Sequence, residues 1–383
     1  MNKIKSNRHT RQMNLEMLRV VTMFMIITLH FLAHGGVLNV IEPPGLKYYF
    51  YWSVAGICYV AVNCYVLITG YFQSCSKFRL KKLLLLLIEV WFYSIFIYVG
   101  LCLFGIRTFT MKDFLTAIFP ILNSEYWFAT IYVGLYIVSP FINWGLSRLD
   151  RRQHLLLLVV LILLFSVWPT FFFFSVGLNF GGGFGIVWFF ILYCIGAYIR
   201  KYAKKDENLW RWAVGCIILL CTIPLSKFLL GKISGNYLNN FIPDSMFYSY
   251  NSVLVLSASV TLFCTFIRID IKNKLFSDMI RFFASSVFGV YLIHDNPYIR
   301  EYMWGRLEVV RYLNLHTFLL IMFGTILTIY LTGTFIDKLR ILLFSRLIQE
   351  QALDRICKGM EEKAFKIYNS WDKETSYEKS SMN

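Results

Sequence analysis

The sequence predicts an all-α protein, a polytopic integral membrane helix bundle of about ten transmembrane helices with both termini in the cytoplasm. The first observation is the composition, because 57% of the 383 residues are hydrophobic and only 16% are charged, whereas soluble globular chains carry about 25% charged residues. Aromatic residues reach 18%, which is typical of helices that face lipid and anchor at its interfaces. The other two observations are the spacing of the apolar stretches and the charges between them.

Apolar stretches of spanning length recur along the whole chain. Each is near the ~20 residues that a helix needs to cross the hydrocarbon, and continuous runs of this length exclude the alternating pattern of a β-barrel. The sixth and ninth stretches have the least distinct limits, because the loops beside them are also aromatic. The expected spans are 17–35, 49–72, 81–104, 126–147, 153–175, 185–200, 210–230, 248–268, 281–298 and 316–340.

The charges between these stretches predict the orientation. Cytoplasmic loops of membrane proteins are enriched in Lys and Arg, and here the basic loops follow the even-numbered stretches, around residues 77–82, 148–152, 200–211 and 268–281. The opposite loops are poor in charge, except for the last one, which contains Arg300, Arg306 and Arg311. This pattern therefore places both termini in the cytoplasm.

The chain divides into a transmembrane domain, residues 1–340, and a tail, residues 341–383, that mixes charges with Leu and Ile. We expect the tail to be cytoplasmic, amphipathic near the membrane and disordered from about residue 370. The formal net charge of +16 follows from the basic loops, so no nucleic-acid partner is expected. Nine cysteines, mostly in apolar runs and without a CxxC pair, indicate neither a disulfide framework nor a zinc site.

Ionisable residues inside the apolar stretches need an explanation, because each costs ~2.5–3.5 kcal/mol or more at the membrane centre. The first stretch has Arg19 near its inner end and His30 eleven residues later, about 16 Å along a helix. The ninth stretch contains His294 at a similar expected depth. A neutral imidazole can accept a proton near neutral pH, so His30 is a candidate general base facing an internal cavity. The alternative is a structural histidine that hydrogen-bonds a neighbouring helix.

Other polar groups leave two interpretations open. Glu89 in the third stretch either pairs with a lysine at the inner end of that stretch or is functional. His34 and His30 form an i,i+4 pair, a spacing that can bind zinc, but Phe31 stands where the HExxH pattern has glutamate, so we expect no metal. The basic segment is either a cytoplasmic anchor or a site for phosphates, and it contains Lys77, Arg79, Lys81 and Lys82.

The chain resembles the membrane acyltransferase-3 family in four motifs that occur in order between about residues 14 and 340. The first motif, 14–19 followed by His30, is similar to the family's L-D-x-L-R opening and its R-x10-H pair. The others are 62–72 at the end of the second stretch, 125–141 in the fourth, and Tyr291-Leu292-Ile293-His294 in the ninth. The chain departs from the family pattern at two of these positions. Glu16 replaces aspartate and keeps the carboxylate, and Thr69 replaces serine and keeps the hydroxyl.

The resemblance implies a membrane-embedded O-acyltransferase of the cell (plasma) membrane, most often an O-acetyltransferase, without an appended esterase-like domain. Acetyl-CoA would be the acyl donor. The acceptor would be a hydroxyl of a surface or capsular polysaccharide or of its lipid-linked precursor. The implied catalytic residues are His30, Glu125 and His294. The implied CoA-binding residues are Arg19, Lys77, Arg79, Lys81 and Lys82, and the implied acceptor-binding residues are Trp127, Tyr132 and Tyr291.

Two other classes of membrane protein compete with this interpretation. A transporter or flippase for a lipid-linked sugar is the main alternative, because intramembrane His and Glu residues also mark proton relays. Transporters often show paired halves, and no internal repeat is visible in this sequence. A polysaccharide polymerase would usually have a large outer loop, whereas the longest outer loop expected here, 298–315, is modest.

Overall fold

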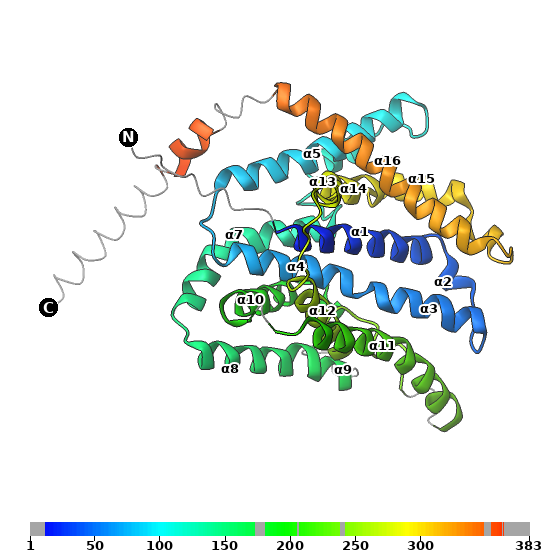
Figure 1. Ribbon diagram of the computed structural model, residues 1–383. Coiled ribbons are helices and arrows are strands. Elements are labelled where there is room, and N and C mark those ends of the chain that lie inside the picture. The colour runs from blue at the N-terminus through cyan, green and yellow to red at the C-terminus, as the bar shows by residue number, and fades with distance from the viewer. Residues whose placement is uncertain are drawn as a thin grey trace, which may run out of the picture.

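The computed structural model describes residues 12–172, 181–204, 207–237, 242–347, 354–361 and 363. Within these ranges the protein is a bundle of helices with no strand, as the sequence predicts (Figure 1). In the described part of the chain, eight helical segments are long and apolar enough to cross a membrane. Five of them are single helices: α1 (Met13–His34), α5 (Leu80–Leu103), α7 (Trp127–Ser147), α11 (Leu209–Tyr237) and α16 (Phe318–Leu347).

The other three long segments are composite. Two of them have short interruptions, at Tyr59 between α3 and α4 and at Ser285 and Ser286 between α13 and α14. In the third, a π-helical turn joins α8 to α9 without a gap. The segments are α3–α4 (Leu46–Cys58 and Val60–Gln73), α8–η1–α9 (Arg151–Ile162, Leu163–Val167 and Trp168–Phe171) and α13–α14 (Lys274–Ala284 and Val287–His294). The remaining two expected stretches correspond to shorter helices, α10 (Ile186–Tyr202) and α12 (Val253–Phe266).

Some boundaries differ from the expected ones. The ninth span begins at Lys274 rather than 281. It ends at His294 rather than 298, because the side chain of Asn296 caps a separate helix, α15 (Pro297–Leu307). The expected domain boundary at 340 falls inside α16. Short helices lie in the loops: α2 (Val37–Val40), α6 (Met111–Ile118), η2 (Gly181–Gly183) and η3 (Val309–Tyr312).

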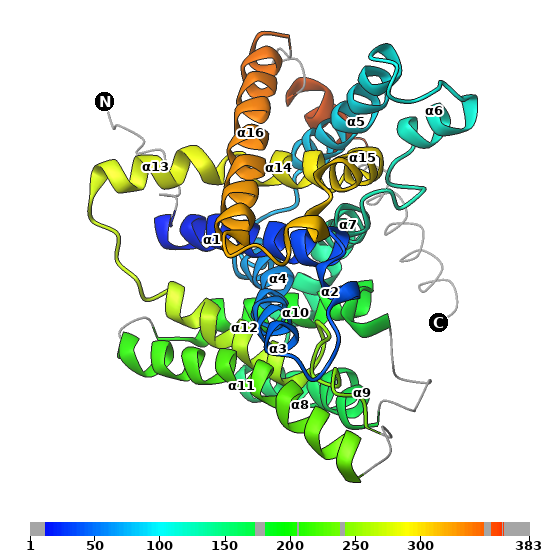
Figure 2. The ribbon, with the colours of Figure 1, turned by 90° about the vertical axis from the view of Figure 1, so that its right-hand side faces the viewer.

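Helix α1 occupies the centre of the bundle. It lies between a group containing α4, α10 and α12 and a second group containing α14 and α16 (Figures 1 and 2). One apolar core joins α4, α7 and α10, and another joins α1, α3, α14 and α16. The first turn of α1 and the last turns of α16 lie on the same side of the bundle in Figure 1.

Helices α4 and α10 pack through two glycines. A Cβ atom added at Gly70 would lie 2.7 Å from Tyr193 Cα, and one added at Gly196 would lie 2.9 Å from Tyr71 N. Both obstacles are backbone atoms, so neither can rotate away. Small residues at a helix interface let two backbones approach closely, which is a main source of packing in lipid.

A buried ionic network joins α5 to α16 and accounts for Glu89. Arg340 lies 2.8 Å from Glu89 and 2.8 Å from Asp337. The hydroxyl of Tyr93 donates to Asp337 Oδ1 at 2.8 Å. The partner of Glu89 is therefore an arginine near the inner end of the last span, and not a basic residue of its own helix.

Candidate active site

The uninterrupted helix α1 places Arg19 and His30 on one face. Eleven residues are about three turns of an α-helix, so the two side chains point to the same side, together with Met23 and Ile26 in the turns between them. All four residues line one cavity of about 290 Å³ in the middle of the bundle. Arg19 and His30 therefore line the same cavity at points about three helical turns apart along α1.

The rest of the cavity wall comes from several other parts of the fold, including Cys58 of α3 and Leu86 of α5. Helix α4 contributes Tyr65 and Thr69, one turn apart, and α7 contributes Trp127 and Tyr132. The α13–α14 segment and the loop before α12 complete the wall with Ser285, Phe288, Tyr291 and Tyr250. Most of the remaining lining is aliphatic. The cavity therefore combines one cationic side chain, one imidazole, several aromatic rings and an otherwise apolar surface.

His30 is in contact with His294 across the interface between α1 and α14. His30 Nδ1 lies 3.1 Å from His294 Nε2, and His294 Nδ1 lies 2.6 Å from the carbonyl oxygen of Val290. A carbonyl can only accept, so His294 carries its proton on Nδ1 and presents Nε2 as an acceptor. His30 Nδ1 must then donate to His294 Nε2. This hydrogen-bond chain assigns the tautomers and leaves the lone pair of a neutral His30 on Nε2.

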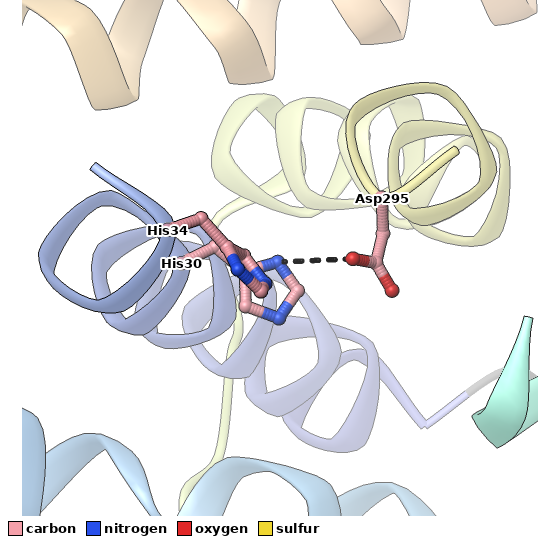
Figure 3. Close-up of side chains that lie close together, drawn as sticks. All are labelled: His30, His34 and Asp295. Atoms are coloured by element: carbon pink, nitrogen blue, oxygen red, sulfur yellow. Dashed lines mark ion pairs between the residues drawn. The ribbon is translucent and has the colours of Figure 1, made fainter. Parts of the chain in front are cut away.

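A carboxylate stands beside the same nitrogen of His30. Asp295 Oδ1 lies 3.7 Å from His30 Nδ1 and 3.2 Å from a guanidinium nitrogen of Arg300 (Figure 3). The Asp295 side chain is only 3% exposed. An anion at this position stabilises positive charge on the His30 ring. The arrangement is that of a general base, with an orienting partner and a negative charge on the side away from its lone pair.

The corner that holds Asp295 is itself fixed by hydrogen bonds. Asn296 accepts from the backbone N–H groups of Tyr298 and Ile299, which caps the start of α15. The same side chain donates to the hydroxyl of Tyr126 at 2.7 Å. Asp295 therefore sits in a short link between α14 and α15 that is also tied to the start of α7.

The comparison with known families agrees with the motifs of the sequence. A family model described as "Acyltransferase domain" matches residues 14–335. The chain belongs to the acyltransferase-3 family. No curated protein and no solved structure shows significant similarity to it. The matched region contains the complete cavity, both histidines and the basic segment. This protein is therefore a membrane acyltransferase built as a polytopic helix bundle.

The acyltransferase brings together most of the site residues predicted from its sequence. The cavity of about 290 Å³, called the main cavity from here on, is lined by Arg19, His30, Trp127, Tyr132 and Tyr291. His294 lies behind His30 and contacts it directly. Glu125 stands apart from this lining, just before α7, and is only partly buried. Burial raises the pKa of its carboxyl, and the positive charge of Arg300 opposes that rise.

The four residues of the basic segment have different surroundings in the acyltransferase. Lys82 lines a small cavity of about 90 Å³, and two of that cavity's other residues, Leu86 and Tyr132, also line the main cavity. Lys77 and Arg79 are exposed at the surface. Lys81 lies 3.0 Å from Asp354, in the helical turns 354–361 of the tail. Lys82 is also exposed, but among these four residues it alone lines a cavity that shares residues with the main cavity.

Two residues of the site were not among those predicted, namely Asp295 and Arg300. A signal for Arg300 exists in the sequence, because it lies in the one outer loop that breaks the charge pattern. A cation placed against the usual distribution indicates a specific partner, and here that partner is Asp295. The adjacency of Asp295 to His294 places it at the end of a span, but its distance from His30 follows only from the packing of α1 against α14.

Proposed function

We propose that this acyltransferase is an O-acetyltransferase of the plasma membrane that uses acetyl-CoA from the cytoplasm. The acceptor in this proposal is a hydroxyl of a surface or capsular polysaccharide, or of its lipid-linked precursor. The observation that supports it is the single cavity that contains Arg19, His30 and the aromatic residues. Arg19 and His30 are separated by about 16 Å along α1. An extended donor with phosphates at one end and a reactive thioester at the other suits this separation.

The cationic end is suited to the phosphates of CoA. A guanidinium binds phosphate oxygens in a bidentate way, and a lysine adds a point charge. Arg19 lines the main cavity and Lys82 lines the small cavity that shares Leu86 and Tyr132 with it, so both would contact the phosphates there. The exposed Lys77 and Arg79 would bind the more distant phosphate groups. Lys81 would join them only after leaving Asp354.

The reaction assigns one task to each of the histidines. The acceptor hydroxyl gives its proton to His30 Nε2 while its oxygen bonds to the thioester carbonyl carbon. The carbon–sulfur bond then breaks, and the departing thiolate of CoA takes the proton from His30. His294 holds the His30 ring in the tautomer that this transfer requires, and Asp295 stabilises the positive charge that His30 carries between the two steps.

The aromatic residues are suited to a sugar acceptor. Trp127 and Tyr250 have nearly parallel rings with centroids 6.1 Å apart, and both line the main cavity. Aromatic rings offer flat apolar faces, and Tyr and Trp add a polar edge. A sugar ring has apolar C–H faces and a rim of hydroxyls, so it matches such a surface. Tyr291 and Tyr132 would contact the acceptor in the same way. Glu125, which lies just before α7, would contact the acceptor from outside the cavity lining.

The test compares acetyl esters on surface polysaccharide from cells that express the wild type or His30→Ala at equal membrane levels. We expect acetylation by the wild type and its loss in the variant. His316→Ala is the matched control, because His316 is exposed in the turn before α16. Equal acetylation by His30→Ala would refute the role of His30. Movement of a lipid-linked sugar across the membrane without transfer from labelled acetyl-CoA would support a flippase and refute the proposal.

A further inference from the structure

We propose that His30, His34 and Asp295 form a binding site for a zinc ion, and that zinc inhibits the enzyme from this site. One ligand atom from each of the three side chains lies within 4.8 Å of the other two. The side chains converge from two elements, with both histidines on α1 and Asp295 at the end of α14 (Figure 3). The two imidazole rings are one helical turn apart, with centroids separated by 4.9 Å.

The chemistry of these donors selects zinc over the abundant alkaline-earth ions. Two imidazoles and one carboxylate, with water in the fourth position, form a common tetrahedral zinc site, whereas Ca²⁺ and Mg²⁺ require oxygen ligands. Zn–N bonds of about 2.0–2.1 Å place ligand atoms about 3.3 Å apart. From the present spacing of up to 4.8 Å, the side chains need to close by at most about 1.5 Å. Small side-chain rotations provide such a movement.

The neighbours of the site decide how strongly it binds. Arg300 opposes a cation, because its guanidinium lies 3.2 Å from Asp295 Oδ1. Among the described residues both ion pairs of Asp295 use Oδ1, so Oδ2 is available to a metal. His30 Nδ1 also donates a hydrogen bond to His294 Nε2 at 3.1 Å, which a metal on that atom must displace. His34 is exposed, so an ion can reach the three side chains from the end of α1.

The inhibitory effect rests on the proposed function, whereas the metal site does not. A zinc ion bound to His30 Nδ1, the nitrogen beside Asp295, displaces the proton from that atom. A neutral ring then carries its proton on Nε2, which can no longer accept one from the acceptor hydroxyl. The ion also neutralises the carboxylate that would stabilise a protonated His30. Zinc bound at this position therefore stops acyl transfer without unfolding the protein. This inference concerns an inhibitory ion and does not require a metal cofactor.

Zinc binding to the purified full-length protein in detergent tests the site directly, with a chromophoric chelator as the competitor. We expect one zinc ion per chain. His34→Gln and Asp295→Asn should each weaken its binding by more than the ~10–100-fold that the loss of an outer partner costs. Arg300→Gln should tighten binding, because the competing cation is gone. His316→Gln, which removes an exposed histidine elsewhere, should have no effect. Equal zinc affinity of the wild type and His34→Gln would overturn the proposal.

Acetyl transfer by the same preparations tests inhibition. Zinc should stop the wild type, and a chelator should restore it. His34→Gln should keep its basal rate and tolerate zinc at the concentration that stops the wild type. Zinc binding without any transfer activity would refute the proposed function and leave the metal site standing. Transfer activity without site-specific zinc binding would refute the metal site and leave the proposed function standing.

Discussion

The substitution Asp295→Asn tests whether Asp295 supports the charge on His30. It removes one negative charge and keeps the size of the side chain. The new amide can still accept a hydrogen bond from Arg300, so the corner between α14 and α15 should keep its shape. The contacts of the neighbouring Asn296 with Tyr126 and with the start of α15 remain.

The expected loss follows from the distance between the charges. His30 becomes positive during the reaction, and Asp295 Oδ1 lies 3.7 Å from its Nδ1. At an effective dielectric constant of about 20, unit charges at that distance attract by about 4.5 kcal/mol. Arg300 shares the same oxygen at 3.2 Å and offsets part of this attraction. We therefore expect a net loss of about 2 kcal/mol, which corresponds to a ~30-fold lower rate.

The assay measures initial rates of transfer from labelled acetyl-CoA in proteoliposomes. The value of kcat should fall about 30-fold, while KM for acetyl-CoA should stay the same because Asp295 does not line the main cavity. Glu301→Gln is the matched control, because Glu301 is on α15 and its side chain is 81% exposed. An unchanged kcat in Asp295→Asn, or an equal fall in both variants, would show that the charge of Asp295 has no part in the chemistry.

Further predictions concern stability and donor binding. Gly196→Ala should lower the free energy of unfolding by ~1–3 kcal/mol, because the new Cβ meets the backbone of α4. Gly145→Ala is the control, because Gly145 has open space around it and the substitution should not destabilise the protein. Thermal unfolding in detergent distinguishes the two variants. Arg340→Met should cost ~3–5 kcal/mol in the same assay, since it leaves the buried Asp337 and the partly buried Glu89 without their cation. Asp354→Asn removes the ion pair with Lys81 and should therefore lower KM for acetyl-CoA. The change should be at most ~5-fold, because an exposed ion pair is worth up to ~1 kcal/mol. A higher KM would contradict the assignment of Lys81 to donor binding.

The parts of the site that lie on one helix could be predicted from the sequence. Arg19 and His30 share a face of α1 because their spacing is about three helical turns, and this depends only on local geometry. The contact between His30 and His294 joins residues 264 positions apart. The expected similarity of depth was correct, although it assumed a straight helix over 281–294 and the structure interrupts this segment at Ser285 and Ser286.

The basic segment shows why side-chain direction could not be predicted in the same way. Lys81 and Lys82 are neighbours in the sequence, but consecutive residues of a helix point about 100° apart. Lys82 consequently borders a cavity, while Lys81 points toward the tail and Asp354. The partner of Lys81 depends on where residues beyond α16 lie, and no periodicity of α5 contains that information. The position of Glu125 outside the cavity lining likewise depends on the loop before α7.

The ion pair between Glu89 and Arg340 has a consequence for the synthesis of the protein. The two residues are 251 positions apart, and ribosomes add roughly 5–20 residues per second. Helix α5 therefore leaves the ribosome about 13–50 s before the arginine that neutralises its carboxylate exists. During that interval α5 is a poor candidate for stable insertion as a lone helix in lipid. Its final position must be settled late in translation, when α16 arrives and closes the bundle.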